Sequence, residues 1–188
     1  MHQPMMTSAD VQELLSVSRT IICRWVKHDL LVPAHRKPRL FPRDRVLGLL
    51  PERLQSRPFR LLHPGTAARR LGVDDGTLRR WTLQGLELAI HLPVALGDKR
   101  QIHRYAEHEL DYIRDIPALQ GRMFGLDGLA DGAGINLFTL QRWINEGQLP
   151  VRTDPAADGL LIWPIDLRNC VFRVRAGLPP PVLAARSI

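Results

Sequence analysis

TLRRWTLQG, at residues 77–85, returns in the same chain as TLQRWINEG at residues 139–147. A looser copy, IICRWVKHD, occupies residues 21–29. Counted from the Trp of each copy, the spacings are 56 and 62 residues. Self-similarity at a nearly constant spacing is typical of proteins built from tandem structural units. The sequence therefore predicts three small units.

A tight turn between two helices is expected just before each copy. A short helical segment is followed by a small residue, a β-branched residue and a residue whose side chain can cap a helix start. The small residues are Ser16, Gly72 and Gly134, and the capping residues are Ser18, Asp74 and Asn136.

Helical periodicity separates each Trp from the Arg beside it. In steps of 100° per residue, Trp25 falls on the same side of its helix as Ile22. Thr20, Arg24 and Lys27 fall on the opposite side, and the other copies divide in the same way. We expect the Trp side chains in the core. The outward-facing arginines are Arg24, Arg80 and Arg142.

A strand-like segment follows each of these helices. Gly85 and Gly147 stand where a helix would end, and Gly97-Asp98 suits a hairpin turn. Each segment closes on an aromatic residue, then Pro or Ala, before further helix: FPRD at 41–44, YAEH at 105–108 and WPID at 163–166. The predicted fold class is mainly α with small β-hairpin wings.

This unit resembles the DNA-binding unit of the MerR/excisionase winged helix-turn-helix superfamily. The shared phrase is a Thr-Leu-Arg-x-aromatic or Arg-Trp helix, then Gly-x-Leu-Pro, then a wing that ends in aromatic-x-x-Asp; TLQRWINEGQLP with IWPID carries it most fully. The resemblance covers residues 7–50, 63–115 and 126–172. It implies three tandem winged helix-turn-helix modules at 1–57, 58–121 and 122–176, before a Pro-rich tail at 177–188.

The charge of the chain favours a polyanionic partner. Its formal net charge is +7, and such an excess is typical of nucleic-acid binding, the alternative being that it only keeps the protein soluble. Residues 1–57 carry +5, whereas residues 58–121 and 122–188 carry +1 each. The first copy is therefore the strongest electrostatic candidate for DNA.

In winged helix-turn-helix units the second helix lies in the major groove and the wing reaches the backbone or minor groove. The resemblance implies that the Arg before the aromatic touches the DNA backbone. The candidate contacts to double-stranded DNA are Ser18, Arg19, Thr20, Arg24, Lys27, Arg36, Lys37, Arg39, Arg43, Thr77, Arg79, Arg80, Lys99, Arg100, His103, Arg104, Thr139, Gln141 and Arg142.

The third copy differs in character. A groove-facing Phe138 could meet a thymine methyl group, but exposed apolar side chains beside acidic ones suit a protein surface better. We therefore expect Leu137 and Phe138 to contact protein, so that self-association or a protein partner would use the third module or the tail.

Several classes of protein are not expected. Cys23 and Cys170 fall in no metal-binding or redox spacing, which favours a reducing, cytoplasmic setting. With DNA as the expected partner, the expected location is cytoplasmic and nucleoid-associated. The seven His residues show no clear ligand spacing, so no metal and no cofactor are expected. No catalytic phrase is present, so we expect no enzyme, and no apolar run is long enough for a membrane span.

Three roles remain open at this stage. The first is a sequence-specific transcriptional regulator, on a mobile element. The second is an excisionase-like architectural factor that bends DNA and steers a recombinase. The third is a protein-interaction scaffold in which only the first module binds DNA.

Overall fold

The structure is a computed structural model that describes residues 4–55, 59–95, 100–116, 124–153 and 160–181. In these ranges the chain is mainly helical, with small antiparallel sheets of three strands each. This agrees with the predicted fold class at that level of detail. No helix in the described ranges is long and apolar enough to cross a membrane.

The chain divides into two compact units. The first unit is Met1–Ala67 with Ala89–His108, and the second is Ala68–Leu88 with Glu109–Ile188. The expected module at 58–121 contributes to both, because its strands pack in the core of the first unit whereas its second helix belongs to the other.

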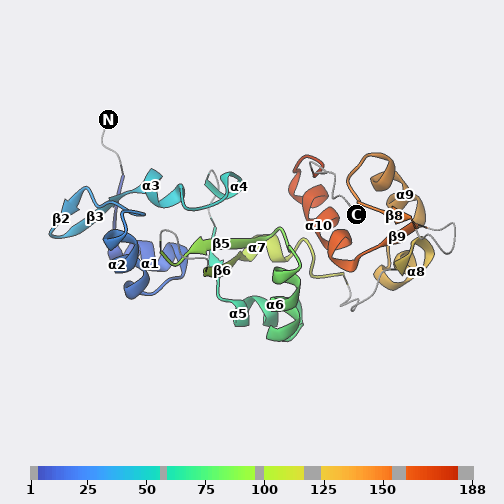
Figure 1. Cartoon of the computed structure of the whole chain (residues 1–188), viewed down its shortest axis with the longest axis horizontal. Helices are drawn as coiled ribbons and strands as arrows, with labels where there is room; N and C mark the ends of the chain where they lie inside the picture. The colour runs from blue at the N-terminus through green and yellow to red at the C-terminus, as the bar shows by residue number, and fades with distance from the viewer. Residues whose placement is uncertain (1–3, 56–58, 96–99, 117–123, 154–159, 182–188) are drawn as a thin grey trace. The chain divides into compact units, whose positions relative to one another are not determined.

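The first unit begins with two helices and a small sheet. Its elements up to residue 55 are β1 (Met5–Thr7), α1 (Ser8–Leu15), α2 (Arg19–Lys27), β2 (His35–Arg36), β3 (Arg39–Pro42), α3 (Arg43–Leu47) and α4 (Glu52–Gln55) (Figure 1). The antiparallel sheet has the order β1-β3-β2. Trp25, Leu15 and Phe41 are fully buried, so the α1–α2 pair packs on this sheet through one apolar core.

A second sheet completes the first unit. It contains β4 (Leu61–Leu62), β6 (Gln101–Ala106) and β5 (Ala89–Pro93), in that order and antiparallel. Ile90 and Leu92 of β5 join the same core as Trp25. The indole N–H of Trp25 also donates to the carbonyl of Pro93 at 2.7 Å, which ties α2 to this sheet.

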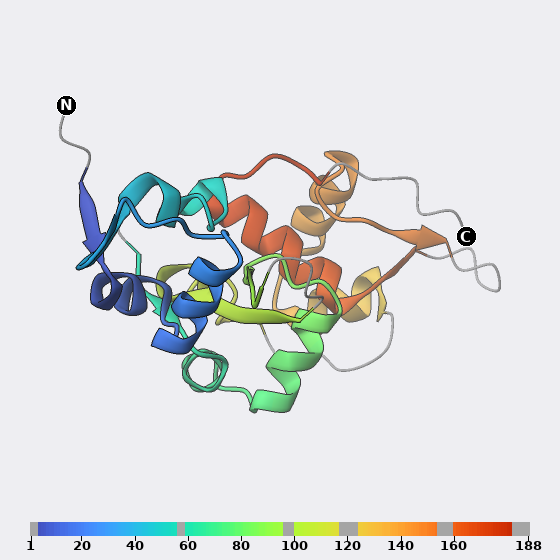
Figure 2. The ribbon, with the colours of Figure 1, turned by 60° about the vertical axis from the view of Figure 1, so that its left-hand side comes forward.

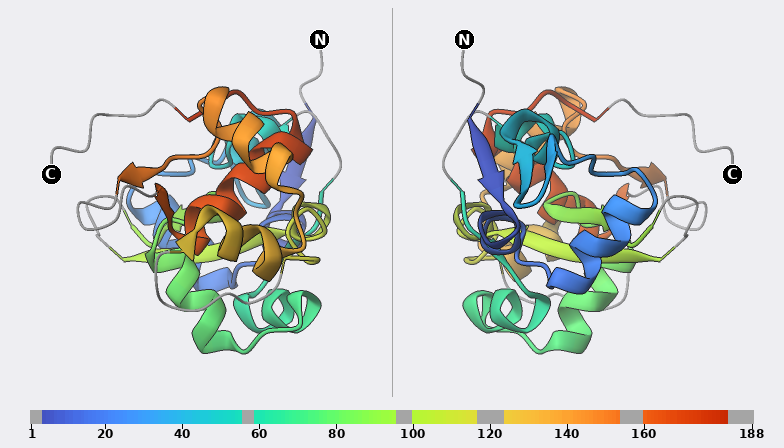
Figure 3. Two further views of the ribbon diagram at one scale, coloured as in Figure 1. Left: turned by 90° about the vertical axis from the view of Figure 1, so that its right-hand side faces the viewer. Right: turned by 90° about the vertical axis from the view of Figure 1, so that its left-hand side faces the viewer.

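The second unit is built around its C-terminal helix. Its elements are α6 (Asp75–Leu83), β7 (Phe124–Gly125), α8 (Leu126–Ala133), α9 (Leu137–Asn145), β8 (Arg152–Thr153), β9 (Leu160–Ile162) and α10 (Pro164–Ala176). The helices α5 (Pro64–Leu71) and α7 (Glu107–Leu110) cross from one unit to the other. Figure 2 shows the β8–β9 hairpin projecting from the helices of this unit, and Figure 3 shows α10 as its long red helix.

One order of elements occurs three times in the described chain. A short strand leads into two helices and a hairpin, and the second hairpin strand pairs with the leading strand. The second helices begin at Arg19, Asp75 and Leu137, which repeats the spacings of 56 and 62 residues seen between the Trp residues. The first helices begin at the same spacings, at Ser8, Pro64 and Leu126.

The backbone repeats as well. The residue that ends each first helix is left-handed: Ser16 (φ 53°), Gly72 (φ 70°) and Gly134 (φ 64°). The residue that ends the turn after each second helix is also left-handed: Asp29 (φ 54°), Gly85 (φ 95°) and Gly147 (φ 70°). Glycine is the residue that adopts this conformation at least cost, so the two later copies have the better-suited residue.

The predicted helix caps are confirmed in two copies. The Asp74 carboxylate accepts from the backbone N–H of Thr77, and the Asn136 side chain accepts from that of Phe138. Ser18 is the N-cap residue of α2, as predicted, but its side chain makes no capping hydrogen bond, so only the expected side-chain bond is wrong. The predicted turn at Gly97-Asp98 and the tail beyond residue 181 lie outside the described residues.

Candidate nucleic-acid interface

The helices α2, α6 and α9 present the same nine-residue pattern of burial. The fourth and seventh positions are buried in each: Ile22, Leu78 and Leu140, then Trp25, Trp81 and Trp143. The prediction of core Trp side chains is therefore confirmed. The first, second, fifth, sixth and ninth positions are exposed or half-buried in each helix, and we call these positions the outward face.

An arginine occupies the sixth position of every outward face. Arg80 and Arg142 are exposed and Arg24 is half-buried. In α9 the arginine already forms an ion pair, because Nε of Arg142 lies 3.9 Å from a carboxylate oxygen of Glu146. An incoming phosphate would have to displace this exposed ion pair, which costs only a fraction of a kcal/mol to about 1 kcal/mol.

The first copy has the most basic surface. The exposed predicted contacts are Ser18 at the start of α2, Arg19, Thr20 and Lys27 on that helix, and Lys37 and Arg39 in the following hairpin. Arg43, expected in the wing, is also exposed but is the first residue of α3. The side chain of Arg36 lies outside what the structure describes. Arg39 donates to the sulfur of Cys23 at 3.2 Å, so the hairpin and the outward face of α2 are in direct contact. The exposure of Cys23 was not predicted from the sequence.

Thr77, a predicted DNA contact, is turned inward. Its side chain is 7% exposed, and its hydroxyl donates to the Asp74 carboxylate at 2.6 Å. This hydrogen bond, with that of the Thr77 backbone, lowers the pKa of Asp74. Thr77 therefore serves the start of α6, and the outward face of this helix is carried by Arg79 and Arg80. Its equivalent Thr139 is half-buried.

Arg104 is the second predicted contact that the structure removes from the surface. It is 7% exposed, and burial lowers its pKa. Its guanidinium donates to the carbonyl of Ser16 from Nε and to that of His103 from Nη1, both at 2.7 Å. Arg104 therefore joins the second sheet to the end of α1. Arg100 is exposed, His103 is half-buried, and Lys99 lies outside the described residues.

The outward face of α9 has a different chemistry. Phe138 is 80% exposed at the position held by Thr20 in α2 and Gly76 in α6. Leu137 is half-buried, and Gln141 is exposed. On α6, Leu83 is 72% exposed. The amount of apolar surface therefore differs between the copies, whereas the arginine position does not.

Helix α10 holds α6 through contacts that the sequence did not reveal. The guanidinium carbon of Arg168 lies 3.8 Å from the centre of the Trp81 ring, and burial lowers the pKa of Arg168 to about 10. Asn169 donates to the carbonyl of Gly85 and accepts from the N–H of Glu87, at 2.9 and 3.0 Å. These contacts reach the core side of α6 and leave its outward face open.

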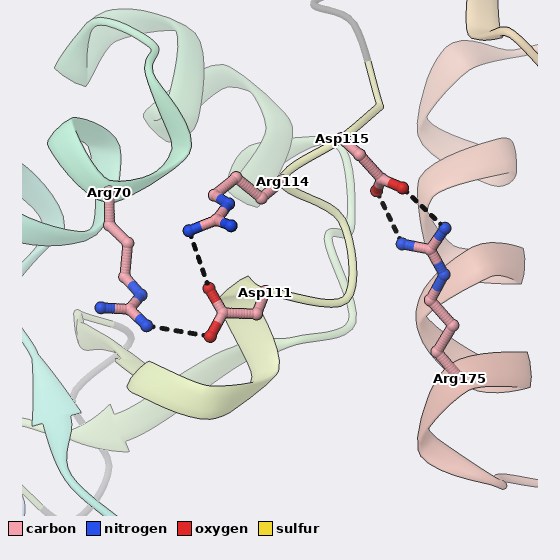
Figure 4. A network of polar contacts seen from close by, with 5 residues as sticks. All are labelled: Arg70, Asp111, Arg114, Asp115 and Arg175. Atoms are coloured by element: carbon pink, nitrogen blue, oxygen red, sulfur yellow. Dashed lines mark hydrogen bonds and ion pairs between the residues drawn. The ribbon is translucent and has the colours of Figure 1, made fainter.

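A set of ion pairs anchors residues 111–115 within the second unit (Figure 4). Asp111 accepts from Arg70 at 2.9 Å and lies 3.6 Å from Arg114. Asp115 is bound by both terminal nitrogens of Arg175, at 2.6 and 2.8 Å. Hydrogen bonding by Arg175 lowers the pKa of Asp115. This segment therefore connects the end of α5 to α10 without using the outward face of α6.

No known protein family, curated protein or solved structure matches this chain. In the ranges that the structure describes, no three His, Cys, Asp or Glu side chains are grouped so that they could hold a metal ion. The candidate site is therefore defined by the three outward faces and by the basic hairpin beside α2.

Proposed function

We propose that this protein binds double-stranded DNA through the outward faces of α2, α6 and α9, as a sequence-specific transcriptional regulator. In this proposal each copy is a winged helix-turn-helix module. The observation that carries it is the shared register of the three helices. All three bury a Trp at the seventh position and present an Arg at the sixth.

The shape of each copy supports this use. A short helix, a turn of three residues and a second helix is the arrangement that places a helix in the major groove. The outward faces hold Arg, Lys, Thr and Gln, which are side chains that bond to phosphates and base edges. The positive charge is greatest in residues 1–57, so α2 and its hairpin would supply most of the electrostatic attraction.

A second candidate is a protein-interaction scaffold in which the third copy binds protein and the first binds DNA. Phe138 favours it, since this residue is 80% exposed on the outward face and its ring carries no charge for a phosphate. Arg142 beside it already pairs with Glu146. The two candidates differ in whether α6 and α9 contact DNA.

The test begins with selection of duplexes from a random library by the full chain. Affinity for the selected duplex is then measured by fluorescence anisotropy over a range of salt. Arg80→Ala should weaken binding by about 1–3 kcal/mol if the side chain reads a base. If it contacts a phosphate, the slope of log K against log salt should fall by about 0.9.

Arg60→Ala is the matched control. It removes the same charge from a side chain that is 77% exposed and lies on none of the three outward faces. If Arg60→Ala weakens binding as much as Arg80→Ala, the assignment of the helix faces is wrong. If no duplex is enriched at any salt concentration, DNA binding itself is wrong. A footprint on the selected site would show whether one, two or three copies touch DNA.

A further inference from the structure

Two histidines face each other across the β5–β6 hairpin. His91 and His103 are directly opposite in the antiparallel register. Because side chains alternate along a strand, they lie on the face opposite to Ile90, Leu92 and Ile102, which pack in or against the core of the first unit. His91 is exposed and His103 is half-buried. The pair therefore reaches solvent from two paired strands.

The geometry of the two rings suits a shared cation. Their Nδ1 atoms are 3.2 Å apart, and the rings meet edge to face at 89°. For an ion bound to both nitrogens at about 2.0–2.1 Å, the usual zinc–imidazole distance, the nitrogen–ion–nitrogen angle would be about 100°. That angle is close to tetrahedral.

We propose that His91 and His103 form a two-imidazole binding site for a divalent transition-metal ion such as zinc. Imidazole is a preferred ligand for zinc, copper and nickel. The two rings supply two ligands, and water would complete the coordination, since the described residues offer no third His, Cys, Asp or Glu in the group. This site does not depend on the proposed DNA binding.

The guanidinium of Arg104, the residue after His103, is bound elsewhere. Arg104 follows His103 on β6, but its side chain lies on the core-facing side of the strand and donates to the Ser16 carbonyl. Its bond to His103 is made to the backbone carbonyl, not to the ring. The imidazoles are therefore separated from this guanidinium by the sheet.

Calorimetric titration of the full chain with zinc chloride, without DNA, tests the proposal. The wild-type chain should bind one ion at a saturable site. His91→Gln should lose that site, and His103→Gln should lose it too. His28→Gln is the matched control, because it removes another exposed His of the first unit and should leave the site intact.

Two results would overturn the proposal. One is the absence of a saturable site in the wild-type chain, which would leave the rings as a hydrogen-bonded pair. The other is unchanged binding in His91→Gln, which would mean that zinc binds elsewhere among the seven His residues. Circular dichroism of each variant checks that the fold is kept, and His91 is exposed, so its replacement should not disturb the core.

Discussion

The left-handed positions of the repeat give the sharpest prediction about stability. Ser16 and Asp29 adopt φ values of 53° and 54°, where the later copies have glycine. We expect Ser16→Gly to stabilise the first unit, and the converse changes Gly72→Ala and Gly134→Ala to destabilise the protein. The reason is that a side chain in the left-handed region crowds its own backbone.

The magnitude follows from two opposing effects. The left-handed conformation costs a residue with a side chain about 1–2 kcal/mol, whereas glycine loses about 0.5–1 kcal/mol more through backbone entropy. The net gain expected for Ser16→Gly is about 0.5–1 kcal/mol on these figures. The capping contacts of Ser16 are all made by its backbone, so glycine keeps them. Asp29→Gly should gain less, because Asp tolerates this region better than most residues.

The glycine replacements isolate the conformational cost. A Cβ added at Gly72 or Gly134 would meet no atom within 4 Å, so no steric clash contributes. Each Ala variant should therefore lose about 1 kcal/mol from the backbone alone. Urea unfolding followed by circular dichroism measures the change. Thermal melting should show a rise of about 2–8 °C for Ser16→Gly, given the usual relation for a unit of this size.

The opposite pattern would refute this reasoning. If Ser16→Gly lowered the free energy of unfolding while Gly72→Ala and Gly134→Ala left it unchanged, the left-handed turns would not persist in solution. Because the chain has two compact units, the unfolding transition of each unit is to be fitted on its own. The comparison of Ser16→Gly with an unaffected second transition then serves as an internal control.

Three further outcomes are expected. Trp25→Phe removes the N–H that donates to a β5 carbonyl at 2.7 Å and should cost about 1–3 kcal/mol in urea unfolding; no loss would mean that water replaces this bond. Asp74→Asn should be less stable than wild type above pH 4, because hydrogen bonding by Thr77 lowers the pKa of the Asp74 carboxyl from 3.8. This stabilisation is lost as the pH falls through the folded-state pKa. A difference in urea midpoint between the variant and wild type that persists at low pH would contradict it. A thiol reagent should label Cys23 in the native protein but not Cys170, which is buried and has a pKa raised to about 12 by burial; two fast thiols would contradict this.

Local features were predictable because they depend on nearby residues. The Trp positions follow from helical periodicity, and the caps at Asp74 and Asn136 follow from side chains that accept from free helix amides. Gly85 and Gly147 take the left-handed conformation that ends these turns. Each of these signals operates within a few residues, so one sequence was enough to read it.

The fate of single polar side chains was not predictable in this way. Arg104 looks like a basic wing residue, yet it is buried against the Ser16 carbonyl, 88 residues away in the sequence. Thr77 looks like a polar contact on an outward helix, yet its hydroxyl closes the start of α6. For Arg104 the deciding partner is a backbone oxygen that only packing brings near. For Thr77 the partner is the capping carboxylate three residues before it, and packing decides that the side chain is buried.

The sequence by itself determined the three-fold repeat, the helix pairs with their hairpins and the outward arginines, because these follow from periodicity and turn chemistry within each copy. The tertiary structure alone decided which of those polar residues remain available and how the copies divide. The strands of the second copy pack in the core with Trp25, whereas Trp81 of its second helix lies against Arg168 of α10. It also brought His91 and His103 together, since strand pairing joins residues that no local pattern connects.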